Sequence, residues 1–498
     1  MVKKLLKVLI VLICLVVQLS VGYLLYLATI NKIHFVKIIY SFFCLYIILK
    51  IIKDSKSYSY ILPWILIFMV VPIPGSIIYL TIKLNLKLNK FLNSVKKEEK
   101  ESKKYLVNEG INNKIEDNSL ARYINNYVKF PVTTNNDVKY FPLGDYALDT
   151  MLEELNKAEK FIFFEYFIVN YGKMWDSILE ILEKKVKEGV EVRVMYDDLG
   201  CLTTLDKNYY RELRKKGIKC EPFNRLKIFG GVVMNNRDHR KILVIDGKVA
   251  FSGGINIADE YINIGSKFGH WKDNCIKVEG DAVWNYTVMF LTLWNSITHE
   301  DSDYTKYKYE FKNRKVSNGL VAPYGENPLE KDMPGENIYL NIINQAHKYV
   351  YIFTPYLIID TDLLNALILA SKRGVDVRIV IPGIPDKKMV YSISESYIEP
   401  LTEGGVKVYK YTKGFIHAKV FVSDDIRATV GTLNMDYRSL YLHFECGCYF
   451  ENNSVIKDIK KDALDTFDES HLVTEKETKT SHFKSFKQSV LRLFAPLT

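Results

Sequence analysis

Long apolar runs without charges mark the N-terminal part of the chain. No charged residue occurs in Val8–Ile30 or in Ser57–Ile82, and each run is long enough to cross a hydrocarbon core of about 30 Å. A shorter apolar run, Ile38–Leu49, lies between Lys37 and Lys50, so it either spans with these lysines at the two interfaces or lies along one interface. The pattern therefore predicts membrane segments within residues 1–82, with spans near 8–30, 36–52 and 57–82.

The orientation of these segments stays open. Lysines precede the first run, and a second group of lysines follows the last one, from Lys83 to Lys104. Two spans would place both groups in the cytoplasm, as the positive-inside rule prefers, whereas three would separate them. A cleaved signal peptide is the alternative for the first run, which is longer than a usual signal core. We predict a multi-pass membrane protein whose catalytic part is cytoplasmic.

Beyond the apolar segments, the pattern changes to strands that alternate with helices. Phe161–Phe164 is typical of a buried strand, and apolar residues at helical spacing follow it up to Val186. Gly189 is placed to end that helix, a second strand is expected at Val190–Met195, and a further helix ends near Gly217. This order predicts an α/β fold with mainly parallel sheets covered by helices on both faces.

Two segments share one polar pattern: His, any residue, Lys, four residues, Asp. A single copy would be a weak motif, but the surroundings repeat as well, with KEGVEVRV before the first copy and KRGVDVRI before the second. Each copy also precedes a turn of small residues that contains an Asn. The candidate site residues are His239, Lys241, Asp246 and Asn256 in the first copy, and His417, Lys419, Asp424 and Asn434 in the second.

The distance between the copies indicates an internal repeat of roughly 180 residues, the size of an α/β lobe. We predict a basic linker along the membrane surface over residues 83–125, a first lobe over 126–315 and a second lobe over 316–498. At the C-terminus, apolar residues such as Phe483, Phe486 and Val490 fall near one helical face. Such a helix either rests on the membrane or packs on the second lobe.

The repeated residue types suit chemistry at a phosphodiester. His and Lys two positions apart on a strand leave from the same face, so both can meet one phosphate. Exchange at phosphorus needs a nucleophile, an acid for the departing alkoxide, and donors around the non-bridging oxygens. Two imidazoles, two ammonium groups and two amides supply this set, and the reaction needs no metal or cofactor. Cys446 and Cys448 lack the second ligand pair of a zinc site.

Over residues 126–498 the doubled signature resembles the phospholipase D superfamily. Four further segments, together with the apolar N-terminus, are similar to bacterial cardiolipin synthases: TPYLIID, GFIHAK, GTLNMDYRS and YLHFECG. The resemblance implies a covalent phosphohistidine, with His239 as nucleophile and His417 as acid and base. The pseudo-twofold repeat leaves the reverse assignment open.

The resemblance also implies roles for four carboxylates. Asp246 and Asp424, which complete the catalytic signature, are expected to brace loops rather than to transfer protons. Asp273 and Glu445 are the candidates for separate carboxylates that bond the far nitrogen of each histidine. Such a bond fixes the imidazole tautomer and stabilises the imidazolium.

The function predicted from these residues is a bacterial membrane enzyme that joins two phosphatidylglycerol molecules into cardiolipin and releases glycerol. The formal charge of +10 suits anionic partners, and with membrane segments present these are phosphatidylglycerol and other anionic lipids rather than nucleic acid. Departures at Val321–Pro323 and Ile359 leave the acceptor open, so a phospholipase D or a phosphatidylserine synthase is the enzymatic alternative. A membrane protein that binds anionic lipid without catalysis is the alternative from another class.

Overall fold

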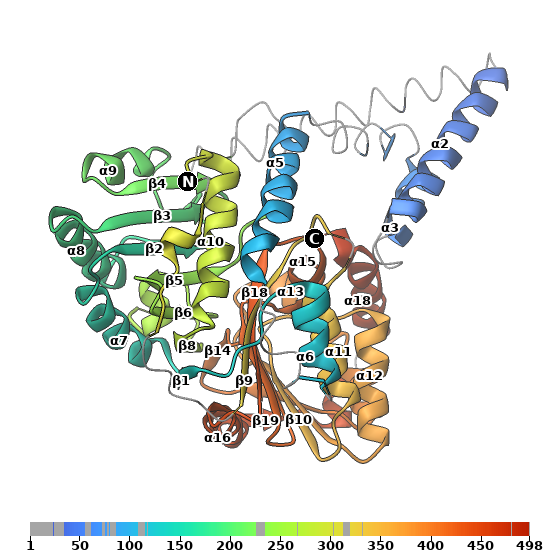
Figure 1. The fold of residues 1–498 in the computed structure, drawn as a ribbon. Helices are drawn as coiled ribbons and strands as arrows, with labels where there is room; N and C mark the ends of the chain where they lie inside the picture. Colours follow the sequence, from blue (N-terminus) through green and yellow to red (C-terminus); the bar gives the residue numbers. More distant parts are fainter. Residues whose placement is uncertain are drawn as a thin grey trace. The chain divides into compact units, whose positions relative to one another are not determined.

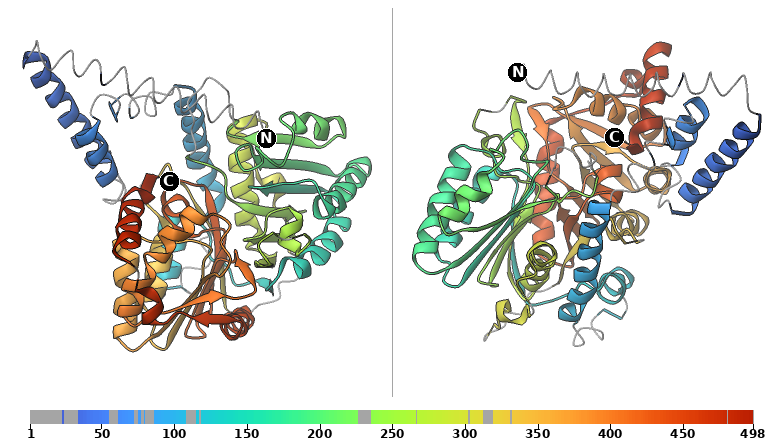
Figure 2. Two further views of the ribbon diagram at one scale, coloured as in Figure 1. Left: turned by 180° about the vertical axis from the view of Figure 1, so that it is seen from behind. Right: turned by 90° about the horizontal axis from the view of Figure 1, so that it is seen from above.

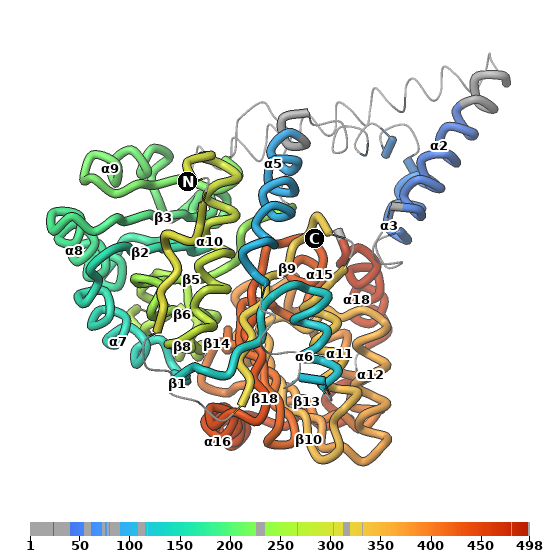
Figure 3. Tube along the Cα trace, in the orientation of Figure 1, coloured from blue at the N-terminus to red at the C-terminus, as the bar shows by residue number. Residues whose placement is uncertain are grey.

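The computed structural model describes residue 23 and residues 34–54, 61–71, 75–76, 79, 86–107, 115–116, 118–225, 235–265, 267–301, 303–311, 319–330, 332–479 and 481–497 (Figures 1 and 3). It divides into two compact units, which we describe separately. One unit contains residues up to Asn89 and the last nine residues, and the other contains Lys90–Leu226 and Met234–Ser489. The second unit carries both predicted lobes, and we call it the catalytic body.

The N-terminal unit contains two well-described helices, α2 (His34–Asp54) and α3 (Ile61–Val70). They contact each other through a small apolar cluster: Ile47, Ile51, Ile61, Trp64, Phe68 and Tyr79. Within the described part of the chain, no helix meets the length and apolarity that a membrane crossing requires. The segment predicted to span near 8–30 lies outside the described residues apart from Tyr23, and the one near 57–82 is described only in part.

The first lobe is built on a seven-stranded sheet in the order β1, β8, β6, β5, β2, β3, β4. Two of its strands follow directly from the apolar runs in the sequence, because every residue of β2 is buried and β3 is buried except for its first residue. The strands are β1 (Asn136–Phe141), β2 (Phe161–Tyr166), β3 (Glu191–Asp197), β4 (Lys219–Phe223), β5 (Lys241–Ile245), β6 (Val249–Gly253) and β8 (Cys275–Gly280).

The second lobe repeats this arrangement in an eight-stranded sheet, in the order β19, β13, β12, β10, β15, β16, β18, β9. Five strands of the second lobe correspond in chain order to five of the first: β10 to β2, β12 to β3, β15 to β5, β16 to β6 and β18 to β8. The strands are β9 (Leu320–Glu326), β10 (Tyr349–Phe353), β12 (Asp376–Pro382), β13 (Lys407–Tyr411), β15 (Val420–Ser423), β16 (Arg427–Gly431), β18 (Glu445–Glu451) and β19 (Ser470–Leu472).

The prediction of mainly parallel sheets is wrong, because both sheets are mixed. In the first lobe only the β2–β3 and β3–β4 pairs are parallel, and the other neighbours are antiparallel. The cause is a tight hairpin directly after each His motif. Asp246 and Gly247 have φ values of 54° and 67°, and Asp424 and Asp425 have φ values of 56° and 61°. In each hairpin three residues separate the paired strand ends, Ile245 from Val249 and Ser423 from Arg427, and two successive residues with positive φ form the tight turn between them.

Helices cover both faces of each sheet, as predicted (Figures 1 and 2). On the outer faces lie α7 (Gly144–Asn156), α8 (Lys173–Lys187) and α9 (Tyr209–Lys215) in the first lobe, and α11 (Pro334–Asn344), α12 (Thr361–Lys372) and α14 (Ile398–Glu403) in the second. Gly189 with φ 90° ends α8, and Gly374 with φ 89° ends α12 at the equivalent place in the repeat. The inner faces of both sheets share one apolar core with α10 (Val283–Thr298) and α16 (Val455–Asp468).

Two short β interactions join the lobes close to the His motifs. Strand β7 (His270–Lys272) pairs in parallel with β14 (Gly414–Ile416), and His417 N–H then donates to the Lys272 carbonyl at 2.7 Å. An isolated bridge pairs Asp238 with Phe444, and His239 N–H donates to the Phe444 carbonyl at 2.9 Å. The second lobe also contains the small β11 (Leu357–Ile358) and β17 (Met435–Asp436) pair. The lobes therefore share backbone hydrogen bonds at both signatures.

Part of the predicted linker belongs instead to the catalytic body. From Lys90 onward, α5 (Leu86–Ser102) packs on the end of α10, where Val95 is fully buried and Ser94 Oγ donates to the Ser296 carbonyl at 2.8 Å. The 3-10 turn that follows, Lys103–Leu106, buries Leu106 in the same core. The Lys-rich and Glu-rich composition suggested a solvated segment, but a narrow apolar stripe anchors it.

The C-terminal helix α18 (His482–Phe494) turns a polar face toward the second lobe. Gln488 is buried and donates to the Ser392 carbonyl on α13 (Lys388–Glu395) at 3.3 Å, and Lys484 lies 3.5 Å from Glu395. Its aromatic side chains point away, since Phe483 is 79% and Phe486 is 68% exposed. The helix thus packs on the second lobe, which is one of the two predicted alternatives, and its contact with a membrane stays a prediction.

Candidate active site

Both signature histidines line one cavity of about 570 Å³ between the lobes. His239 precedes β5 and His417 precedes β15, so the two pseudo-equivalent strands bring the imidazoles to one place. The two Asn side chains, Asn256 and Asn434, line the same cavity. Residues from distant parts of the chain therefore meet where a single phosphodiester could contact all four.

Each imidazole is held by a carboxylate from the opposite lobe. His239 Nδ1 lies 2.9 Å from both carboxylate oxygens of Glu445, which begins β18 of the second lobe. His417 Nδ1 lies 2.6 Å from Asp273 Oδ2, which follows β7 of the first lobe. The short inter-lobe β interactions explain this crossing, because each aligns a histidine with the residue next to the carboxylate. In both cases Nδ1 is occupied and Nε2 stays available for chemistry.

The Glu445 carboxylate is itself fixed by hydroxyl groups. Ser439 Oγ donates to it at 2.6 Å, and Thr432 Oγ1 donates to its other oxygen. Burial raises the pKa of Glu445, while Lys241 and these hydroxyls act in the opposite direction and stabilise the charged carboxylate. Asp273 is positioned by its neighbour, since Asn274 N–H donates to its free oxygen at 2.8 Å.

The signature lysines lie buried beneath the histidines rather than on the cavity wall. Lys241 Nζ donates to the carbonyl of His239 at 2.7 Å, and Lys419 Nζ donates to the carbonyl of His417. Burial lowers the pKa of Lys241 to about 8 and that of Lys419 to about 7, against the attraction of Glu445 and Asp273. An ammonium group has three donors, so each lysine keeps protons that could reach a phosphoryl oxygen.

Burial also favours neutral imidazoles. The pKa of His239 is held well below its usual range, first by desolvation and then by the charge of Lys241. Desolvation and the charge of Lys419 lower the pKa of His417 to about 4, although Asp273 partly offsets the shift. Both shifts have the same direction, so they leave open which imidazole is the nucleophile.

Aromatic side chains surround the two imidazoles. The ring of Phe167 meets the ring of His239 edge to face at 4.9 Å, and Tyr261 meets His417 in the same way at 5.5 Å. Trp271 and Phe415 complete the wall beside His417, with ring centroids at 5.7 and 6.0 Å. These rings limit the access of water to the reacting atoms and strengthen electrostatic interactions inside the cavity.

The aspartates of the signature lie apart from the cavity, at the far end of their strands. Asp246 accepts hydrogen bonds from the backbone of Glu159, Lys160 and Phe161 at 2.8 to 2.9 Å. Asp424 accepts the equivalent three bonds from His347, Lys348 and Tyr349. Asp246 and Asp424 are therefore not part of the catalytic site, and that part of the prediction is wrong. Each aspartate instead binds the hairpin turn to the start of a neighbouring strand, which is the bracing role expected for it.

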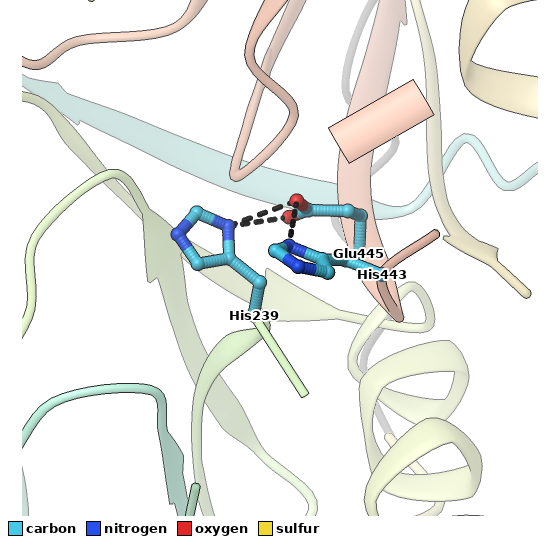
Figure 4. Close-up of side chains that lie close together, drawn as sticks. All are labelled: His239, His443 and Glu445. Carbon is cyan, nitrogen blue, oxygen red and sulfur yellow. Dashed lines mark hydrogen bonds and ion pairs between the residues drawn. The ribbon is translucent and has the colours of Figure 1, made fainter. Parts of the chain in front are cut away.

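One functional candidate was missed in the sequence. His443 is buried beside His239, with ring centroids 5.7 Å apart, and its Nδ1 lies 3.9 Å from Glu445 (Figure 4). The signal was its position two residues before Glu445, which places both side chains on one face. The ligand atoms of His239, His443 and Glu445 lie within 4.8 Å of one another, close enough to hold a metal ion. However, Glu445 already accepts two hydroxyls, and Lys241 adds positive charge there.

The comparisons with known proteins agree with this geometry. The family model described as cardiolipin synthase, PLD-like domain matches residues 151–294 and 339–466. A cardiolipin synthase of Alkalihalophilus pseudofirmus is 32% identical over 92% of this chain and 93% of its own length. An uncharacterized protein of Streptococcus mutans is 44% identical over 90% of this chain and 99% of its own length. Among solved structures, the phosphatidylserine synthase of Haemophilus influenzae shares the fold, with a TM-score of 0.59 at 17% identity over 76% of this chain and 98% of its own. The chain therefore belongs to the cardiolipin synthase family of phospholipase D-like enzymes.

Proposed function

We propose that the enzyme transfers the phosphatidyl group of one phosphatidylglycerol to the headgroup hydroxyl of a second, which yields cardiolipin and glycerol. The observation that carries the proposal is the pair of imidazoles in one cavity, each with Nδ1 bonded to a carboxylate of the opposite lobe. Such a pair can act first as nucleophile and acid, then as leaving group and base.

In the first step, His239 Nε2 attacks phosphorus and the bond between phosphorus and the glycerol oxygen breaks. The electron pair of that bond goes to the oxygen, which takes a proton from His417 Nε2. The bound phosphodiester is anionic, so its attraction raises the pKa of His417 above the value of about 4 that the protein alone gives it. Glu445 stabilises the positive charge that develops on His239.

In the second step, a hydroxyl of the acceptor lipid attacks phosphorus and loses its proton to His417. The bond between phosphorus and Nε2 breaks, and its electron pair returns to the imidazole of His239. Lys241, Lys419, Asn256 and Asn434 would surround the non-bridging oxygens and balance their charge. One phosphodiester is broken and one is formed, so no nucleotide is needed.

We propose that the apolar N-terminal segments anchor the enzyme in the bacterial cell membrane with the catalytic body on the cytoplasmic side. Such an anchor would favour lipid over water as the acceptor. The exposed Phe483 and Phe486 on α18 would add an interfacial contact beside α13. A cavity that opens at the bilayer surface admits lipid and limits hydrolysis.

The test is lipid mass spectrometry after incubation of the purified full-length enzyme in vesicles of phosphatidylglycerol. Cardiolipin and glycerol in equal amounts would support the proposal, and phosphatidic acid as the main product would identify a hydrolase instead. His239→Ala and His417→Ala should each abolish cardiolipin formation. Continued synthesis by both variants would refute the mechanism.

A further inference from the structure

The cavity that would receive an anionic lipid also contains two carboxylates that the reaction does not use. Glu260 of the first lobe and Asp386 of the second line it together with the histidines. A carboxylate near an anionic phosphate is unfavourable unless it interacts with another part of the substrate. These groups therefore point to a neutral, hydroxyl-bearing part of the ligand.

Asp386 is held in place with one oxygen left over. Tyr356 OH donates to its Oδ2 at 2.6 Å, and Lys387 Nζ lies 3.9 Å from the same oxygen. The Asp386 side chain is 17% exposed. Its Oδ1 accepts no hydrogen bond from the described part of the chain. A fixed carboxylate with an open oxygen can accept a hydrogen bond from a ligand.

Asp386 lies on the His417 side of the cavity. Burial raises the pKa of Tyr261 and of Tyr356, and the charge of Asp386 adds to both shifts, while the Tyr261 ring contacts His417. With His417 as acid and base, this is the side where glycerol leaves and where the acceptor hydroxyl arrives. Asp386 therefore lines the part of the cavity that would receive the headgroup.

Positive charges occupy the outer part of the same wall. Lys387 is 63% exposed, and Lys267 of the first lobe is also exposed, while both line the cavity. Exposure rises from the buried His417 to Asp386 and then to Lys387, which indicates an order of acid and base, hydroxyl acceptor, then cation. The headgroup of an acceptor phosphatidylglycerol has the matching order: attacking hydroxyl, secondary hydroxyl, then phosphate.

We propose that Asp386 and Lys387 form the acceptor subsite, in which Asp386 accepts the secondary hydroxyl of the glycerol headgroup and Lys387, with Lys267, holds the acceptor phosphate. This inference rests on the proposed function and names its acceptor specificity. Serine fits poorly, because its carboxylate would lie against that of Asp386. Tyr356 is a positioning residue that keeps the Asp386 carboxylate oriented.

Competition between acceptors tests the role of Asp386. Full-length enzyme in phosphatidylglycerol vesicles is given equal concentrations of isotope-labelled glycerol and 1-propanol, and the ratio of labelled phosphatidylglycerol to phosphatidylpropanol is measured. The two alcohols offer the same attacking group, and only glycerol offers the secondary hydroxyl. Asp386→Asn should lower this ratio about tenfold, the loss expected for one hydrogen bond to a charged group. Asp386→Glu should restore part of it, and Tyr356→Phe should lower it by a smaller factor.

The lysine has a separate signature. Lys387→Gln should lower the yield of cardiolipin relative to labelled phosphatidylglycerol, because only the lipid acceptor brings a phosphate. It should leave the glycerol to propanol ratio as in the unmodified enzyme. Asp149→Asn, an exposed carboxylate on α7, is the matched control and should change neither ratio.

Two results would overturn the inference: an unchanged alcohol ratio in Asp386→Asn, or equal losses of cardiolipin and of labelled phosphatidylglycerol in Lys387→Gln. Failure of the proposed function looks different, since the unmodified enzyme would then release mainly phosphatidic acid and form no cardiolipin.

Discussion

Replacement of Glu445 by Gln tests whether the carboxylate that crosses from the second lobe drives the nucleophile. Glu445 is fully buried, and its oxygens accept from His239 Nδ1, Ser439 and Thr432. Gln has nearly the same shape, but it is neutral, and one oxygen becomes an amide that donates. The substitution removes the charge that stabilises the imidazolium and places an amide donor opposite one of the two hydroxyl donors.

The expected magnitude follows from these contacts. A hydrogen bond to a charged group contributes about 1.5–3 kcal/mol, which corresponds to about a 10- to 150-fold lower rate of phosphohistidine formation. The mismatched amide adds a stability cost of about 1–3 kcal/mol, because a buried donor loses its partner. The rate effect should therefore be measured at a temperature at which the variant is fully folded.

The assay is a single-turnover reaction with phosphatidylglycerol, quenched with denaturant and followed by intact-protein mass spectrometry. Glu445→Gln should slow the appearance of the covalent adduct, while Asp273→Asn should slow both its appearance and its decay, since His417 acts in both steps. The reverse pattern would make His417 the nucleophile. A rate for Glu445→Gln within twofold of the unmodified enzyme would refute the role assigned to this carboxylate.

Three further predictions follow from the site. Binding of a non-hydrolysable phosphonate analogue of the lipid should weaken about tenfold or more from pH 6 to 9. Burial lowers the pKa of Lys419 to about 7 and that of Lys241 to about 8, so both lysines lose their charge as pH rises. Lys419→Arg should reduce this loss of affinity, and a constant Kd would contradict the effect of burial on the lysines. Asp424→Ala should lower the free energy of unfolding by about 3 kcal/mol, because three backbone N–H groups lose a charged acceptor. Chemical denaturation measures this loss, and an unchanged stability would contradict the prediction. Gly254→Ala should reduce kcat at least about tenfold with little change in KM. The new Cβ would lie 1.9 Å from Asp273 Oδ1 and displace the Asp273 carboxylate from His417. A normal kcat would show that His417 does not need this carboxylate.

The sequence was most informative where its patterns are local. The buried strand at Phe161, the helix end at Gly189 and the repeat itself follow from short-range periodicity, and the structure has them. The hairpins were missed although Asp246-Gly247 is a strong turn signal, because the helices nearby favoured a parallel reading. The fold of each lobe was thus predicted, and the reversed direction of β5 and β8 in the first lobe, and of β15, β18 and β19 in the second, was not.

The crossing of the carboxylates could not be derived from spacing. His239 and Glu445 are 206 residues apart, and His417 and Asp273 are 144 apart, so their pairing depends on how the two lobes dock. The burial of Val95 on α5 depends on the same docking, because only the assembled body provides a partner for so narrow an apolar stripe.

Because each lobe supplies the carboxylate that orients the histidine of the other lobe, both histidines depend on the same docking of the two lobes. An opening of the seam between the lobes would break both bonds together, so the nucleophile and the proton donor would lose their orientation at the same time.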